Sequence, residues 1–320
     1  MTTQGFALIR NVMALLALSV SVSAFSQNVV ISTGASGNTY DTMVKQLAAV
    51  CQSEIGRPII SKPSSGSMES VDRLLNNEVP AAIVQADVLT FRSQQDDLSR
   101  VKALFTLHAE EVHVLALSQT QKLGGLWGIG GSALNSLADL RERKVGAWGG
   151  SFLTAQVIRL QSEIGFHVVE LADEASALKA LRDKSVDALL SVGGSPQAWV
   201  VGLDRKFRLL PITDADAAKL KGVYRPARLS YANLGQTGVQ TVATDALLVV
   251  RDYKTPTMSA MLSQTRACFV RHLTELQESP GNHAKWQSVS LSVQPKWPSY
   301  VDLTATSTRP AGNRLGRQVP

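Results

Sequence analysis

The fold is decided by the stretch Val29-Val30-Ile31-Ser32-Thr33-Gly34-Ala35-Ser36-Gly37-Asn38-Thr39-Tyr40. Its apolar start predicts a strand over 29–33, its Gly- and Ser-rich middle predicts a turn, and a helical pattern runs over 39–54. Such a turn presents unpaired backbone N–H groups at the positive end of a helix dipole, which suits a carboxylate or another anion. For a single turn of this kind, plain helix capping by Ser and Thr is the better explanation.

The same alternation continues along the chain. Further strands are predicted over 59–63, 81–85, 101–107, 112–117, 144–147, 168–171, 187–192 and 207–211, and a long extended run over 239–250. Helices are predicted over 68–76, 137–143, 152–164, 175–184, 214–220 and 256–278, with a short one after Pro196. A Gly-rich segment over 119–135 indicates a domain boundary or a surface flap. Alternating strands and helices predict an α/β protein with a mostly parallel sheet covered on both faces.

Two other turns resemble the first in composition. They are Ser64-Ser65-Gly66-Ser67 and Gly149-Gly150-Ser151, the latter followed by Thr154. Because parallel sheets place ligands at the carboxyl ends of their strands, we favour ligand contact over simple capping for the three turns together.

Two further side chains belong to the same hypothesis. Gln85 and Asp87 end the apolar run over 81–87, and strand alternation would put both on one face. A buried Asp87 could accept a hydrogen bond from a ligand ammonium or from a backbone turn. Trp148 is expected either against the ligand or in the core.

Enzymatic and metal chemistry find little support in the sequence. Both Gly149-Gly150-Ser151-Phe152-Leu153 and Gly193-Gly194-Ser195-Pro196-Gln197 lack the closing glycine of a nucleophile elbow. His108 and His113 are five residues apart across an expected strand pair, whereas helical zinc ligands are four apart. No phosphate-loop motif occurs. We therefore expect no catalytic residue, no metal and no cofactor.

The amino terminus is typical of an export signal. Arg10 is followed by the apolar run 12–18 and by small residues up to Ala24, so residues 1–26 are predicted to be a signal peptide. Cleavage fits after Ala24 or after Ser26. The run is shorter than the roughly 20 residues that span a bilayer, so a soluble secreted product is expected. The formal net charge of +6 is mild and forms no basic face with interleaved aromatic residues, which argues against nucleic-acid binding.

Cys51 and Cys268 are the two cysteines of the chain, and both fall on helical patterns. In an oxidising compartment they could form one disulfide. Two buried thiols fit the sequence about as well.

Taken in order, these segments resemble the TAXI family, the extracytoplasmic solute receptors of one branch of the tripartite ATP-independent periplasmic (TRAP) transporters. The matching segments are 31–40, 64–71, 81–87, 101–105, 111–114, 136–140, 144–146, 186–188, 208–212 and 240–244. The match spans nearly the whole mature chain. One departure is that Phe152 and Leu153 stand between Ser151 and Thr154, where the family has a Ser-Gly-Thr core.

The resemblance implies a type II periplasmic-binding-protein fold, with two α/β lobes joined by a hinge. Lobe one would comprise 27–118 with 245–320 and lobe two 119–244, with hinge segments near Leu117 and Asp245. It also implies a periplasmic, non-catalytic monomer that delivers a small carboxylate, such as glutamate or a dicarboxylate, to an integral-membrane permease. A subunit that serves a periplasmic sensor would have the same fold. A periplasmic hydrolase using Ser151 or Ser65 is the remaining alternative.

Combining the turns with the resemblance gives a set of expected ligand-binding residues. In lobe one they are Thr33, Ser36, Asn38, Thr39, Tyr40, Ser65, Ser67, Gln85 and Asp87. In lobe two they are Trp148, Ser151, Thr154, Gly194 and Thr241.

Overall fold

The computed structural model describes residues 28–118, 134–220, 222 and 224–300. The predicted signal peptide with its cleavage site, and most of the Gly-rich segment over 119–135, lie outside these residues. Among the described residues, no helix combines the length and the apolarity needed to cross a bilayer.

Strands and helices alternate along the chain, as the sequence predicts. The first elements are β1 (Val29–Ser32), α1 (Thr39–Cys51), β2 (Ile59–Lys62), α2 (Ser67–Leu75), β3 (Ala81–Gln85), α3 (Ala86–Arg92) and β4 (Val101–Leu117). The middle elements are η1 (Leu137–Leu140), β5 (Lys144–Ala147), α4 (Gly150–Ser162), β6 (His167–Glu170), α5 (Glu174–Arg182), β7 (Ala188–Gly193), α6 (Ala198–Val201), β8 (Phe207–Leu209) and α7 (Asp214–Ala217). The last are β9 (Arg225–Tyr231), η2 (Ala232–Leu234), β10 (Gln236–Arg251), α8 (Pro256–Glu278) and η3 (Ala284–Ser288).

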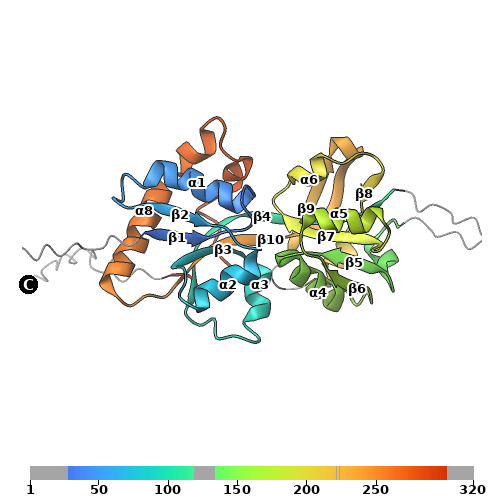
Figure 1. Cartoon of the computed structure of the whole chain (residues 1–320), viewed down its shortest axis with the longest axis horizontal. Coiled ribbons are helices and arrows are strands. Elements are labelled where there is room, and N and C mark those ends of the chain that lie inside the picture. Colours follow the sequence, from blue (N-terminus) through green and yellow to red (C-terminus); the bar gives the residue numbers. More distant parts are fainter. Residues whose placement is uncertain (1–27, 119–133, 221, 223, 301–320) are drawn as a thin grey trace, which may run out of the picture.

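In the described residues the strands form one ten-stranded sheet with the order β2-β1-β3-β10-β4-β7-β5-β6, while β8 pairs with β4 and β9 pairs with β10. Strands β2, β1 and β3 are parallel, as are β7, β5 and β6. Figure 1 shows two bodies side by side, with β4 and β10 running from one to the other. We call the part around β1–β3 with α1, α2, α3, α8 and η3 the first body, and the part around β5–β9 with α4–α7 the second body.

The two long strands change partners on the way across. Strand β4 pairs with β10 from Val101 to Glu111 and with β7 from Glu111 to Ala116. Strand β10 pairs with β9 up to Ala243 and with β3 from Ala246. The crossing point, where Ala243 faces Glu111, therefore lies at the junction of the two bodies.

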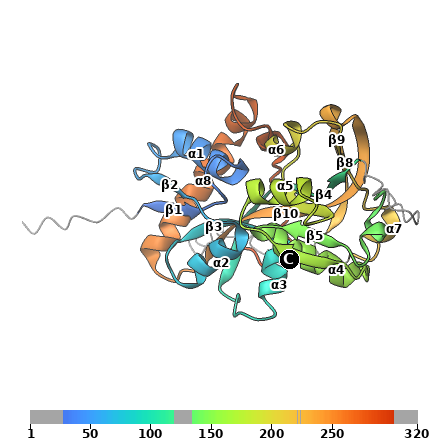
Figure 2. The ribbon, with the colours of Figure 1, turned by 45° about the vertical axis from the view of Figure 1, so that its right-hand side comes forward.

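Each half of the sheet is covered on both faces. In the first body, α1 and α8 pack on one face around Met43, Leu47 and Phe269, and α2 and α3 pack on the other. In the second body α4 lies on the opposite side of the sheet from α5 and α6 (Figures 1 and 2). These layers leave the carboxyl ends of β1, β3 and β5 facing the junction.

A disulfide joins Cys51 at the end of α1 to Cys268 in α8. Of the two possibilities that the sequence leaves open, the structure has the bridge. It ties the carboxyl-terminal helix to the first helix across 217 residues of chain.

The structure corrects three local predictions. Residues 101–117 form one strand, because the polar segment His108–Glu111 stays extended while β4 crosses between the bodies. The chain turns into α3 at Ala86, so Gln85 and Asp87 do not share a strand face. Strand β9 was not predicted from the sequence, because Pro226 and its exposed polar residues obscure the alternation.

Candidate functional site

A pocket of about 450 Å³ lies between the two bodies, a volume that suits a small ligand. The first body contributes Gly34, Ala35, Gly37, Asn38, Thr39, Tyr40, Ser65, Gly66, Ser67, Gln85, Glu110 and His283. The second body contributes Trp148, Gly149, Gly150, Ser151, Glu174, Ser191, Val192, Gly193, Gly194, Pro196, Gln197, Ala198 and Trp199. All three turns that the sequence singles out therefore reach the same space.

The turns before α2 and α4 touch each other across the pocket floor. Gly149 has a φ of +51°, and a Cβ placed there would lie 2.5 Å from the carbonyl oxygen of Ser65. Gly66 has a φ of +136°, and a Cβ there would lie 3.0 Å from the backbone nitrogen of Gly150. Both positions thus require glycine for the backbone conformation and for the close approach of the two bodies.

The three helices that follow the Gly- and Ser-rich turns begin at the pocket without a side-chain cap. They are α1, α2 and α4, whose N-cap residues Asn38, Gly66 and Gly149 make no capping hydrogen bond. Capping elsewhere does not follow the pocket, because α5, which begins at the pocket, has a capping box and α8, which lies away from it, has no side-chain cap. Simple capping therefore does not explain the composition of these three turns.

The donors at these helix starts are partly occupied. Asp41 accepts from the N–H of Gly37 at 2.7 Å, and Glu69 accepts from the N–H of Ser65 at 2.7 Å. For the first residue of each helix, Thr39, Ser67 and Gly150, the described part of the chain offers the N–H no hydrogen-bond acceptor. Three residues that line the pocket therefore have a backbone donor at a positive helix end without a partner in the described residues.

The second wall includes a pair of aromatic rings. The rings of Trp148 and Trp199 meet edge to face, with centroids 5.7 Å apart and an interplanar angle of 68°. The indole Nε1 of Trp199 donates to the side-chain oxygen of Gln197. These contacts fix an apolar surface opposite the helix starts of the first body.

Glu110 is the buried acid of the pocket. It lies on β4 with only 4% of its surface exposed, and its Oε2 accepts from the hydroxyl of Tyr40 at 2.6 Å. Burial raises the pKa of this carboxyl to about 7, against the lowering effect of the hydrogen bond from Tyr40. The same burial, together with the charge of Glu110, raises the pKa of Tyr40 well above its usual value.

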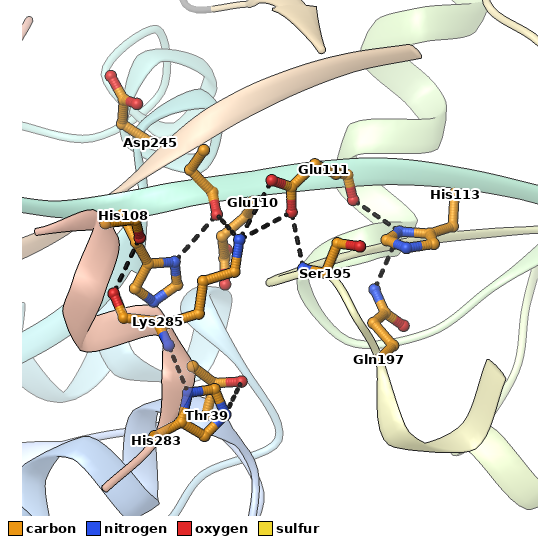
Figure 3. Close-up of polar contacts among 12 residues, drawn as sticks. Thr39, His108, Glu110, Glu111, His113, Ser195, Gln197, Asp245, His283 and Lys285 are labelled. Atoms are coloured by element: carbon orange, nitrogen blue, oxygen red, sulfur yellow. Dashed lines mark hydrogen bonds and ion pairs between the residues drawn. The ribbon is translucent and has the colours of Figure 1, made fainter. Parts of the chain in front are cut away.

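A second polar network borders the pocket and joins the bodies (Figure 3). The ammonium of Lys285, from η3, lies 3.1 Å from both carboxylate oxygens of Glu111 and 3.2 Å from the carbonyl of Ala109. Glu111 in turn accepts from the N–H of Ser195 in the second body at 2.7 Å. Lys285 is thereby held by the crossing strand and is not among the pocket-lining residues.

The histidines near the crossing are neutral and structural. Burial lowers the pKa of His108 to about 3 and that of His113 to about 4. The Nε2 of His113 lies 2.8 Å from the hydroxyl of Tyr231. Among the described residues, the one candidate metal group is Glu54, Cys268 and His272, and its sulfur is committed to the disulfide.

Sequence comparison assigns the chain to a family. The model of the NMT1-like family matches residues 31–258, which is most of the chain. The chain belongs to the NMT1-like family. No curated protein sequence matches it significantly.

Solved structures show how this NMT1-like protein is folded. The structure of Tv2483 bound to L-arginine superposes with a TM-score of 0.52 at 11% identity, covering 84% of this chain and 95% of that one. The GluR0 ligand-binding core from Nostoc punctiforme in complex with L-glutamate gives a TM-score of 0.48 at 13% identity, covering 81% and 96%. An ancestral arginine-binding protein bound to arginine gives 0.49 at 13% identity, covering 78% and 93%. The fold is that of type II periplasmic binding proteins, as the sequence predicts.

Most of the residues predicted to bind ligand in this NMT1-like protein line the pocket. They are Asn38, Thr39, Tyr40, Ser65, Ser67, Gln85, Trp148, Ser151 and Gly194. Others do not line it: Thr33, Ser36, Asp87, Thr154 and Thr241. Thr33 is buried with its hydroxyl 3.0 Å from that of Ser61, and Thr241 donates to the carbonyl of Val112.

Asp87 joins the bodies instead of lining the pocket. Its Oδ2 accepts from Thr154 on α4 at 2.5 Å and from the hydroxyl of Tyr224 at 2.8 Å, both in the second body. The sequence had suggested a ligand ammonium or a backbone turn as the partner. The side-chain hydroxyls take this place because α3 turns Asp87 away from the end of β3.

The bulky residues at the start of α4 are also accounted for. Leu153 is 5% exposed and packs among Val84, Val88 and Leu89 of the first body. Phe152 packs against the core of the second body. Neither side chain lines the pocket.

The sequence did not predict several residues that line the pocket. Glu110 lies in a polar segment between two predicted strands, where the sequence predicts the connection of a hairpin. Gln197, Trp199 and His283 belong to no recognised ligand-binding motif. Only the unusual persistence of polar residues between two apolar runs, at His108–Glu111, could have pointed to a buried polar strand.

Proposed function

We propose that this chain is a periplasmic solute-binding protein that closes two lobes around a small solute bearing a carboxylate. The observation that carries the proposal is the convergence of the N–H groups of Thr39, Ser67 and Gly150 on one pocket. Such donors at helix starts stabilise an anion without a basic side chain. The solute-bound proteins that share this fold, among them Tv2483 with L-arginine, fit the same role.

For the division into lobes we propose the predicted boundaries, 27–118 with 245–320 for lobe one and 119–244 for lobe two, except that residues 112–117, which pair with β7 and β8, go with lobe two. The pocket lies between them, so separating the lobes would admit the solute and closing them would bury it. The contacts of Asp87 with Thr154 and Tyr224, and of Glu111 with Ser195, would form on closing.

For the partner we propose a membrane permease of the TRAP type, which rests on the sequence resemblance to the TAXI receptors. The proposal describes a binding protein and not an enzyme. The hydroxyl of Ser151 accepts from the N–H of Val192, and that of Ser65 donates to Glu69. Neither serine has a histidine base among its hydrogen-bond partners in the described residues, which counts against the hydrolase alternative.

The test is a thermal-shift and calorimetric screen of the purified mature protein against L-amino acids and short dicarboxylates. A solute at a hundredfold excess over its Kd stabilises the protein by about 2.7 kcal/mol. We expect at least one carboxylate to raise the melting temperature without being turned over. If no carboxylate shifts melting, or if a solute is hydrolysed, the proposal is wrong.

A further inference from the structure

The charges that line the pocket are unusual for a site that takes an acid. Among the described residues the ionisable lining groups are Tyr40, Glu110, Glu174 and His283, and neither Lys nor Arg is present. The nearest buried cation, Lys285, is held by Glu111 and the carbonyl of Ala109. A plain dicarboxylate would therefore meet the helix starts at one end and carboxyl groups at the other.

Glu110 is positioned to form an ion pair with a positive charge in the pocket. It is almost fully buried on the crossing strand, yet it lines the pocket. One of its oxygens is held by the hydroxyl of Tyr40 at 2.6 Å, which fixes the orientation of the carboxyl. Asp87 and Glu111 add negative charge nearby, and no Lys or Arg among the described residues lines the pocket, so a cation entering it would compensate the buried charge of Glu110.

We propose that Glu110 is the acceptor for a cationic amine of the solute, so that the site selects an amine-bearing carboxylate over the corresponding compound without the amine. The carboxylate end would lie at the starts of α1, α2 and α4, and the ammonium at Glu110. This inference rests on the proposed function for the carboxylate end only. It assigns to Glu110 the role of accepting a ligand ammonium, which the sequence suggests for Asp87. In the structure Asp87 accepts from Thr154 and Tyr224 instead.

Binding of an amine at Glu110 should release the proton that this carboxyl carries in the free protein. Burial raises the pKa of Glu110 to about 7, so near neutral pH a large fraction of the free protein carries a proton there. Because an ammonium favours the carboxylate form, binding should release that proton and affinity should rise as pH increases from 6 to 8.

Other ionisable groups face Glu110 from the elements around it. Tyr40 on α1 has a pKa well above its usual value, and burial lowers the pKa of His283, before η3. Asp87 on α3, His108 and Glu111 on β4, Lys285 on η3 and Glu174 on α5 also lie around the pocket and its buried border, and burial lowers the pKa of His108 to about 3. A variant at Glu110 itself is therefore needed to assign the released proton.

The experiment compares solutes that differ only in the amine. The panel is the twenty standard L-amino acids, succinate, glutarate and 1,5-diaminopentane, with the desamino counterpart of each binder, such as glutarate for L-glutamate. Affinities are measured by titration calorimetry at pH 6 and pH 8, in two buffers of different ionisation enthalpy to count released protons. We expect amine-bearing binders to exceed their desamino counterparts by at least about tenfold, with affinity rising with pH.

Variants assign the effect to one residue. Glu110→Gln keeps the acceptor for Tyr40 and should reduce the affinity of the amine-bearing solute by about tenfold or more, remove the pH dependence, and leave the desamino compound unaffected or tighter. Glu170→Gln, at an exposed acid of β6 that does not line the pocket, should change little. Equal weakening of both compounds by Glu110→Gln would mean a merely structural residue and would overturn the proposal. If Glu110→Gln does not fold, the protons released when the wild-type protein binds the amine-bearing solute decide. Release that fades as the pH rises from 6 to 8 supports the proposal, and no release overturns it.

The outcomes separate this inference from the proposed function. If carboxylates bind and the amine adds nothing, the inference is wrong and the proposed function stands. If 1,5-diaminopentane binds in a Glu110-dependent way and no carboxylate binds, Glu110 is the amine acceptor and the proposed function, with its carboxylate end, is wrong. If nothing in the panel binds, both are wrong.

Discussion

The carboxylate of Asp87 lies 2.5 Å from the hydroxyl of Thr154, and this hydrogen bond joins α3 of the first body to α4 of the second. Tyr224 donates to the same oxygen at 2.8 Å. The bond lies behind the pocket and does not line it, so it can stabilise the closed arrangement without contacting a solute.

Removing the donor from this contact should weaken the junction. We expect Thr154→Val to lower the free energy of unfolding by about 1–3 kcal/mol, because a buried acceptor loses one partner. Thr265→Val is the matched control, since Thr265 is buried like Thr154 but donates only within its own helix, α8. Urea denaturation of the two variants measures the difference. Equal changes in both would show that the bond across the bodies contributes nothing.

The glycine contact between the turns should limit closure. A Cβ in Gly149→Ala would lie 2.5 Å from the carbonyl oxygen of Ser65, so the bodies could not approach as closely. We expect solute affinity to fall by at least about tenfold, or about 1.4 kcal/mol. Gly238→Ala is the control, because Gly238 also has a positive φ, of +66°, but has open space around its Cβ. A similar loss of affinity in both would attribute the effect to backbone strain alone.

The disulfide should stabilise the first body. Cys51 and Cys268 are separated by 217 residues, and closing so long a loop restricts the unfolded chain strongly. We expect reduction to lower the free energy of unfolding by about 2–5 kcal/mol. The double variant Cys51→Ala with Cys268→Ala should be insensitive to reductant. Alkylation of unreduced protein should find no free thiol from these two residues, and finding two would contradict the bridge.

Much of the architecture was accessible from the sequence because local signals agreed with the fold. Strands β3 and β5 and helix α8 have the predicted bounds, and in α8 the proline at Pro256 marks the first turn. The turns were recognised because Gly, Ser and Thr interrupt apolar runs. At these turns the residues that favour a turn conformation are also the residues that offer polar groups to a ligand.

Tertiary structure decided the parts that sequence reasoning missed. Glu110 and Glu111 look like the polar tip of a hairpin, but they are buried because β4 continues across the junction and carries them to the pocket. Asp87 was assigned to a strand since no Gly or Pro marks the turn into α3. In both cases the partner that makes a buried acid tolerable, Tyr40 for Glu110 and Thr154 for Asp87, lies far away in sequence.

Glu110 should also leave a signature in the stability of the free protein. Its pKa is raised from 4.5 to about 7, so the folded state binds more protons than the unfolded state between these values. Stability from this group is therefore full below pH 4.5 and is lost as pH rises through 7, by about 3 kcal/mol. We expect the stability of Glu110→Gln relative to wild type to increase by up to that amount from pH 5 to pH 8, measured by urea unfolding at each pH. A constant difference would place the pKa near its ordinary value.

The helix starts can be tested one donor at a time. Thr39 is the first residue of α1, where a proline is tolerated because this N–H has no partner within the helix. Asn38 before it is extended, with a ψ of 173°, which suits a residue preceding proline. Thr39→Pro therefore removes one backbone donor from the pocket and keeps the helix.

The comparison with Thr39→Ala isolates that donor. Thr39→Ala keeps the N–H and removes only the hydroxyl, which lies 3.4 Å from the Nε2 of His283. If the N–H of Thr39 holds a carboxylate, Thr39→Pro should weaken solute binding by about 1.5–3 kcal/mol and Thr39→Ala by much less, as titration calorimetry can measure. Circular dichroism and melting temperature check that α1 is intact in both variants. Equal affinities for the two would remove Thr39 from the anion site and leave the starts of α2 and α4 to hold the carboxylate.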